Sequence, residues 1–134
     1  MAHEPLIYIV DDDESIRQAV RTLLESTGRR AAAFDSAEQF LASGAVGVAD
    51  CLIVDVRMPG ISGLELHQRL LAADYRIPTI VFTAHADDVT RARALAAGAA
   101  AFLPKPFRPE ILLQAVEASL RPQAAPRPRR ENRQ

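Results

Sequence analysis

The stretch Leu6-Ile-Tyr-Ile-Val-Asp-Asp12 decides the fold, because a short run of β-branched and other apolar residues stops abruptly on two carboxylates. Three more runs end in a comparable way: Cys51-Leu-Ile-Val at Asp55, Thr79-Ile-Val-Phe at Thr83, and Ala101-Phe-Leu-Pro at Lys105. Such runs are typical of buried strands in parallel sheets. The carboxyl ends of parallel strands lie at one edge of the sheet, where ligands bind. We therefore expect three carboxylates, a hydroxyl and an ammonium to meet at that edge.

Helical patterns separate these runs. Ala31 to Phe34 is a weak further strand, and residues 44–50 are expected to form a loop. Ser36 and Ser62 each open a capping box, and Pro109 suits the first turn of a helix. Apolar residues at helical spacing predict helices around 16–24, 36–41, 62–71, 87–97 and 109–120. The prediction is an α/β fold of (βα)5 type, a doubly wound three-layer sandwich with a five-stranded parallel sheet, as in flavodoxin-like folds.

The bulk composition sets limits on the protein's class. The 134 residues suit one domain, and a net charge of −1 gives no general attraction to nucleic acid. Cys51 is the only cysteine and stands in an apolar run, so a small buried residue is expected. No apolar stretch approaches ~20 residues and no signal peptide is visible, which favours a cytoplasmic protein without membrane contact. Residues 121–134 are rich in arginine and proline and are expected to form a flexible tail or linker.

The expected meeting of Asp11, Asp12 and Asp55 carries the chemistry. Two like charges ~4 Å apart repel by about 4 kcal/mol at an effective dielectric near 20. Lys105 supplies a single positive charge, so negative charge remains that a hard divalent cation could compensate. Mg²⁺ is such a cation, and it binds through one or two carboxylates. Asp13 is instead interpreted as the N-cap of the first helix.

A carboxylate beside a metal and a lysine can act as a nucleophile toward phosphorus, and Asp55, at the end of the strand predicted to be central, is the candidate. The metal and Lys105 would neutralise charge on the transferred oxygens, and the Thr83 hydroxyl could donate to one of them. The joint placement of these residues is the signal, because a lone threonine or lysine is usually structural or on the surface.

Four motifs carry a resemblance to a known family: Val10-Asp-Asp-Asp-Glu14, Asp55-Val-Arg-Met-Pro-Gly60, Thr83-Ala84 and Lys105-Pro-Phe107. Together they resemble the receiver domain of two-component response regulators, and the longer stretches around Asp55 and Lys105 are similar to the FixJ type. The resemblance covers residues 5–120, so residues 1–120 are predicted to be the receiver domain.

The resemblance implies a phosphorylation-activated switch. Asp55 would accept a phosphoryl group from a sensor histidine kinase, and Asp11, Asp12, Asp55 and the Arg57 carbonyl would surround Mg²⁺. Thr83 and Lys105 would bind the phosphoryl group, and the Lys105–Pro106 peptide would be cis. The chain would be no enzyme beyond its own Mg²⁺-dependent phosphorylation and dephosphorylation. It would be either a single-domain regulator with a downstream protein target or the receiver part of a transcriptional regulator.

Thr83 and Phe102 are the expected switch residues. If Thr83 moves toward a phosphoryl oxygen, Phe102 on the adjacent strand can rotate into the space it leaves. The helix predicted at 87–97 would respond, because its apolar face is weak (Val89, Ala92, Leu95, Ala96). The family pattern suggests a homodimer through this helix and the fifth strand. His67, among polar neighbours, is predicted to lie on the surface.

Three other functions are compatible with parts of this pattern. A flavodoxin-like nucleotide carrier is rejected, because the acidic run at 11–14 would repel a phosphate. A haloacid-dehalogenase-type phosphatase would need a second carboxylate two residues after Asp55, where Arg57 stands. The alternative that stays open is a receiver-fold adaptor that acts through protein contacts without phosphorylation.

Overall fold

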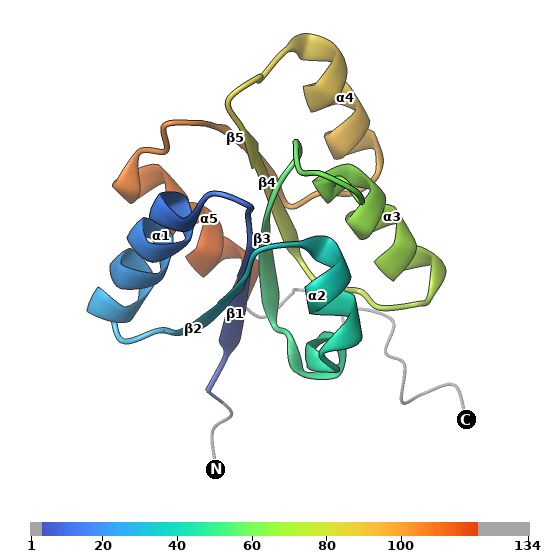
Figure 1. Ribbon diagram of the computed structural model, residues 1–134. Helices are drawn as coiled ribbons and strands as arrows, with labels where there is room; N and C mark the ends of the chain where they lie inside the picture. The colour runs from blue at the N-terminus through green and yellow to red at the C-terminus, as the bar shows by residue number, and fades with distance from the viewer. Residues whose placement is uncertain (1–3, 121–134) are drawn as a thin grey trace.

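The computed structural model describes residues 4–120 and shows a five-stranded sheet between two layers of helices (Figure 1). The strands are β1 (Leu6–Val10), β2 (Arg30–Phe34), β3 (Cys51–Asp55), β4 (Thr79–Thr83) and β5 (Ala101–Pro104). The helices are α1 (Glu14–Ser26), α2 (Ala37–Ala42), α3 (Gly63–Ala72), α4 (Asp88–Ala96) and α5 (Pro109–Leu120). A 3-10 helix, η1 (Ala45–Val48), lies within the segment predicted as a loop. The predicted tail at 121–134 lies outside the described residues.

All strand pairs are parallel, in the order β2-β1-β3-β4-β5. The chain therefore moves to one side of β1 for β2 and then to the other side for β3, which confirms the doubly wound topology. β3 lies at the centre of the sheet, so the run that ends at Asp55 is the central strand, as predicted.

Two apolar clusters fill the space on either side of the sheet. Ile7, Ile9 and Ile53 pack with α1 and α5 on one face, whereas Tyr8, Val54 and Val81 pack with α2, α3 and α4 on the other. Alternate residues of one strand point to opposite faces, so continuous apolar runs are needed to bury both faces. Cys51 is buried as expected, and burial raises the pKa of its thiol to about 12.

Side-chain caps fix where the helices begin. The Asp13 carboxylate accepts from the backbone N–H groups of Ser15 and Ile16 at the start of α1, so the N-cap prediction is confirmed. Ser36 and Ser62 accept from the backbone N–H groups three residues further on, at the starts of α2 and α3. Each cap satisfies a backbone donor that has no partner within its helix.

The predicted apolar face of α4 is wrong. Val89, Ala92, Leu95 and Ala96 are all exposed, with 69% of Val89 and 44% of Leu95 accessible to solvent. Ala94 is the residue of α4 that is buried. In an alanine-rich helix the small side chains fit against the sheet on any face, so spacing alone does not select the buried one.

His67 is also misplaced by the sequence pattern. It is 3% exposed on α3, on the side that also carries the buried Leu64 and Leu70. Desolvation lowers the pKa of its imidazole, which keeps the ring neutral at pH 7. No helix within residues 4–120 has the length and apolar content needed to span a bilayer.

Gly63 begins α3 directly against the end of β3. A Cβ at this position would overlap the backbone oxygen of Asp55 and lie 2.8 Å from the Asp55 carbonyl carbon. The absence of a side chain therefore lets α3 approach the strand that carries Asp55.

Gly63→Ala is expected to destabilise the protein by about 1–3 kcal/mol, the usual cost of forcing an extra carbon into a packed site. The helix preference of alanine alone would stabilise it by about 1 kcal/mol, so the two effects predict opposite signs. Gly47→Ala is the control, because open space surrounds Gly47, and it should change stability by about 0.5 kcal/mol or less. Urea unfolding of both variants measures the difference, and a stabilised Gly63→Ala protein would contradict the packing argument.

Candidate functional site

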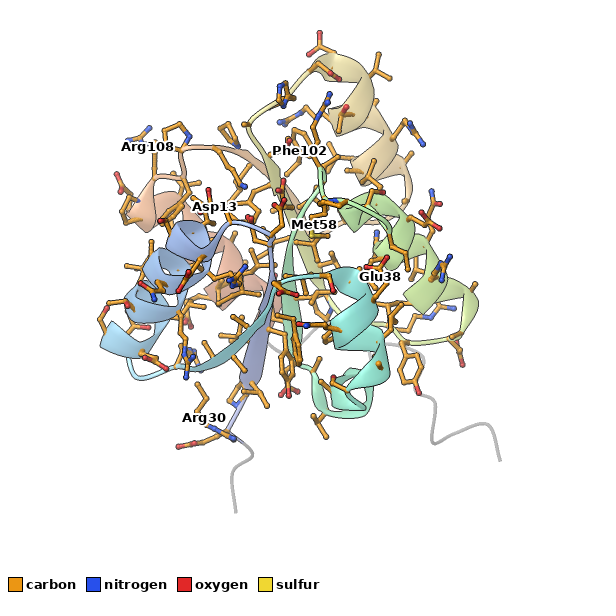
Figure 2. All side chains as sticks on the ribbon, in the orientation of Figure 1. Asp13, Arg30, Glu38, Met58, Phe102 and Arg108 are labelled. Carbon is orange, nitrogen blue, oxygen red and sulfur yellow. The ribbon has the colours of Figure 1, made fainter. Side chains whose placement is uncertain are left out.

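The carboxyl ends of β1, β3 and β5 bring one cation and two carboxylates together. The Lys105 Nζ atom lies 2.8 Å from Asp11 Oδ2 and 3.2 Å from Asp55 Oδ2. Asp11 and Asp55 are buried, and the Lys105 side chain is 14% exposed. Figure 2 shows Asp13, Met58 and Phe102, which surround this end of the sheet.

Asp11, Asp12 and Asp55 form an acidic cluster in which one carboxylate oxygen from each lies within 4.8 Å of the others. Asp12 is exposed at the rim, whereas the other two lie deeper. Three oxygen donors, one of them open to solvent, fit the needs of a hard divalent cation that keeps part of its water shell. The arrangement is therefore suited to hold a metal ion.

Backbone contacts hold the two buried carboxylates in place. Asp11 Oδ1 accepts from the Asp13 N–H at 2.8 Å, and the Arg17 guanidinium donates to the Asp11 backbone oxygen at 2.7 Å. Asp55 Oδ1 accepts from the Arg57 N–H at 3.3 Å. Arg57, the second residue of the loop between β3 and α3, thus contacts Asp55 itself.

The environment raises the pKa of Asp55. Burial has the largest effect, the negative charge of Asp11 adds to it, and the positive charge of Lys105 offsets only part. Burial alone would lower the pKa of Lys105, but its contacts with Asp11 and Asp55 outweigh burial and raise it. Lys105 is therefore a stable cation, and it also lies 4.9 Å from the centre of the Phe82 ring, within cation–π range.

Thr83 and Phe102 lie on the face of the sheet that α4 covers. Thr83 ends β4, fully buried, and its Oγ1 accepts from the His85 N–H at 3.1 Å. Phe102 is paired with Val81 in the adjacent strand, and alternation along β4 puts Val81 and Thr83 on the same face. The Arg91 guanidinium of α4 lies 6.0 Å from the centre of the Phe102 ring.

Comparison with known proteins gives the class of the chain. Residues 7–117 match the family model described as "Response regulator receiver domain". Nodulation protein W of Bradyrhizobium diazoefficiens is 41% identical over 114 residues, which are 85% of this chain and 50% of that protein. Transcriptional regulatory protein FixJ of Azorhizobium caulinodans is 42% identical over 114 residues, 85% of this chain and 54% of that protein. The crystal structure of FixJ-N matches with a TM-score of 0.81 and 33% identity, over 92% of this chain and 99% of that one.

The chain belongs to the response regulator receiver domain family. Its resemblance to FixJ-type receivers and the predicted flavodoxin-like sheet are thereby confirmed. The chain spans about half the length of the curated relatives that it matches.

The structure brings Asp11, Asp12, Asp55 and Lys105 together, as the strand pattern predicted. It also shows the Lys105–Pro106 peptide as cis. Three neighbours of the site were missed: Arg17, Phe82 and Glu38, which accepts from the Ile61 N–H. Phe82 could have been found from its place before Thr83. The other two are charged residues of helices, and nothing in their local sequence marks them.

The raised pKa of Asp55 predicts a pH-dependent cost in stability. The native protein holds a proton on Asp55 more tightly than the unfolded chain does, so ionising this residue destabilises the fold. The cost is absent below the pKa of an unfolded aspartate, about 3.9, and develops as the pH rises through the folded pKa.

Without divalent cations, Asp55→Asn should therefore need more urea to unfold than the wild type at pH 7. The gap should narrow as the pH falls toward 4. Asp13→Asn, which keeps a capping oxygen, is the matched control and should need no more urea than the wild type at pH 7. An Asp55→Asn protein that is less stable than the wild type at pH 7 would mean that the Lys105 ion pair dominates instead.

Proposed function

We propose that Asp55 is the phosphoacceptor of a two-component signalling switch. The observation that carries the proposal is the ion-pair geometry: one ammonium contacts both Asp55 and Asp11 beside a metal-suited acidic cluster. A carboxylate oxygen of Asp55 attacks the phosphorus of a phosphohistidine in a sensor histidine kinase. The new P–O bond forms as the P–N bond breaks, and the imidazole leaves with its electron pair.

The roles of the neighbouring residues follow from charge. Asp11, Asp12, Asp55 and the backbone carbonyl of Arg57 would hold Mg²⁺, which would supply positive charge to neutralise the phosphoryl oxygens. Lys105 would contact the same oxygens, and it keeps its charge because its contacts with the two carboxylates raise its pKa. Thr83 donates its hydroxyl to a phosphoryl oxygen. We infer no enzymatic activity on a separate substrate beyond phosphorylation and dephosphorylation of Asp55.

The partners are a sensor histidine kinase and either a downstream protein or an output domain. Known relatives of about twice the aligned length, one of them named a transcriptional regulatory protein, support the second possibility. Nucleic-acid binding by these residues is not expected, given the net charge of −1. The cytoplasmic location expected from the sequence stays a prediction.

Acetyl phosphate with Mg²⁺ is expected to add about 80 Da to the protein, the mass of one phosphoryl group, in intact mass spectrometry. The adduct should disappear in Asp55→Asn and remain in Asp13→Asn, which changes a capping residue of the same type. Lys105→Ala should slow its formation by about 10²–10³, the usual effect of removing one preorganised charge-stabilising group. A wild-type protein that gains no mass would favour the adaptor that works without phosphorylation.

The output of the switch is proposed to pass through Thr83, Phe102 and α4. Thr83 leaves its contact with the His85 N–H when it bonds the phosphoryl group, and Phe102 turns into the vacated space. That turn removes the ring from beneath Arg91, so α4 is released from one of its contacts. Phosphorylation biases this equilibrium by the difference in contacts between the two states.

The exposed face of α4 and strand β5 are the proposed dimer surface. Beryllofluoride, which mimics the phosphoryl group, should make the protein elute earlier in size-exclusion chromatography, at the volume of a dimer. Thr83→Val keeps the shape of the side chain and removes the hydroxyl, so it should bind beryllofluoride but stay a monomer. A Thr83→Val protein that dimerises like the wild type would remove Thr83 from the switch.

A further inference from the structure

The loop between β3 and α3, residues 56–62, is contacted by helix α2, which precedes β3 in the chain. Glu38 of α2 accepts from the Ile61 N–H through Oε2 at 3.0 Å, across 23 positions of the chain. Figure 2 shows Glu38 on α2, at the side that faces α3. The bond joins a charged acceptor to a backbone donor, the stronger class of protein hydrogen bond.

Gly60 leaves the space in which this carboxylate lies. A Cβ on Gly60 would overlap Glu38 Oε2 and lie 3.1 Å from its carboxyl carbon. Gly60 also has a φ of 79°, which residues with a side chain rarely adopt. The turn is therefore shaped so that the Glu38 carboxylate can reach the backbone of the loop.

The same loop contains the residue assigned to the metal. Its two ends are held near β3: the Arg57 N–H donates to Asp55 Oδ1 at 3.3 Å, and the Gly63 N–H donates to the Val56 oxygen at 3.2 Å. Met58 is buried in the core cluster, so the middle of the loop is anchored on the inside. Glu38 holds the outer side, at the turn that follows Met58-Pro59.

We propose that Glu38 is a positioning residue, which fixes the β3–α3 loop so that the Arg57 carbonyl points at the cation beside Asp55. This inference rests on the proposed function for two assignments, that of Mg²⁺ to the acidic cluster and that of the Arg57 carbonyl to its ligands. Glu38 acts through the loop and does not touch the reacting atoms.

Mg²⁺ titration by calorimetry, with no phosphodonor, tests the proposal in the full chain. Glu38→Ala should bind Mg²⁺ about three- to tenfold more weakly, the effect of one hydrogen bond with a charged acceptor. Glu38→Gln keeps an acceptor oxygen and loses the charge, so it should stay within about twofold of the wild type. If the charge of Glu38 attracted the cation directly, the two variants would weaken binding equally, which would overturn the proposal.

Glu65→Ala is the matched control. Glu65 is also a first-turn glutamate, at the start of α3, but its carboxylate contacts Arg69 instead of the loop backbone. Its removal changes the net charge by the same amount and should leave Mg²⁺ affinity within about twofold of the wild type, the scale of a minor surface charge effect. An equal loss in Glu38→Ala and Glu65→Ala would refute the positioning role.

Hydrogen exchange of the Ile61 amide gives a second readout. Its protection should fall in Glu38→Ala and be retained in Glu38→Gln, whereas unchanged protection in Glu38→Ala would refute the contact. The acetyl phosphate experiment on the wild type separates the two proposals. If Mg²⁺ binding depends on Glu38 but the protein gains no phosphoryl group, only the proposed function is refuted. If the protein is phosphorylated but its Mg²⁺ affinity does not depend on Glu38, only this inference is refuted.

Discussion

The ammonium of Lys105 between Asp11 and Asp55 is the interaction on which the rest of the site depends. Without a cation, two buried carboxylates so close together would repel strongly, and burial would favour their neutral forms. Lys105 offsets only part of this cost, since the pKa of Asp55 stays raised. The site is therefore held in a state that further positive charge would relieve, which is the physical basis for expecting a metal there.

The fold keeps this costly arrangement by placing it at the end of a well-packed sheet. β3 is central, and the strands on either side of it, β1 and β4, are buried through most of their length. The apolar clusters on both faces supply stability that the polar edge does not. Buried like charges at the strand ends, together with well-packed apolar residues elsewhere, are the pattern expected at a functional site.

The residues at the ends of the strands could be predicted from the sequence. Apolar runs that stop on polar residues located Asp11, Asp55, Thr83 and Lys105, because parallel strands put their ends at one edge. The helix caps could also be predicted, because their contacts are local: Asp13, Ser36 and Ser62 bond to backbone groups two or three residues away. The predictions failed where partners come from distant elements. The buried face of α4 depends on which alanine fits the sheet, the burial of His67 depends on α3 packing, and the contact of Glu38 depends on a turn that follows another strand.

The small apolar area that α4 buries makes this helix easy to displace. A helix that buries Ala94 alone has little apolar area at stake when it moves, because the free energy of burial scales with the area removed from water. Phe102 and Thr83, by contrast, are buried beneath it and belong to strands that cannot move without breaking the sheet. Under the proposed switch, a change at the acidic edge would therefore be transmitted more cheaply by rotation of a side chain and displacement of α4 than by any movement of the strands. The low cost of that displacement follows from the same alanine-rich composition that made the helix hard to orient from sequence.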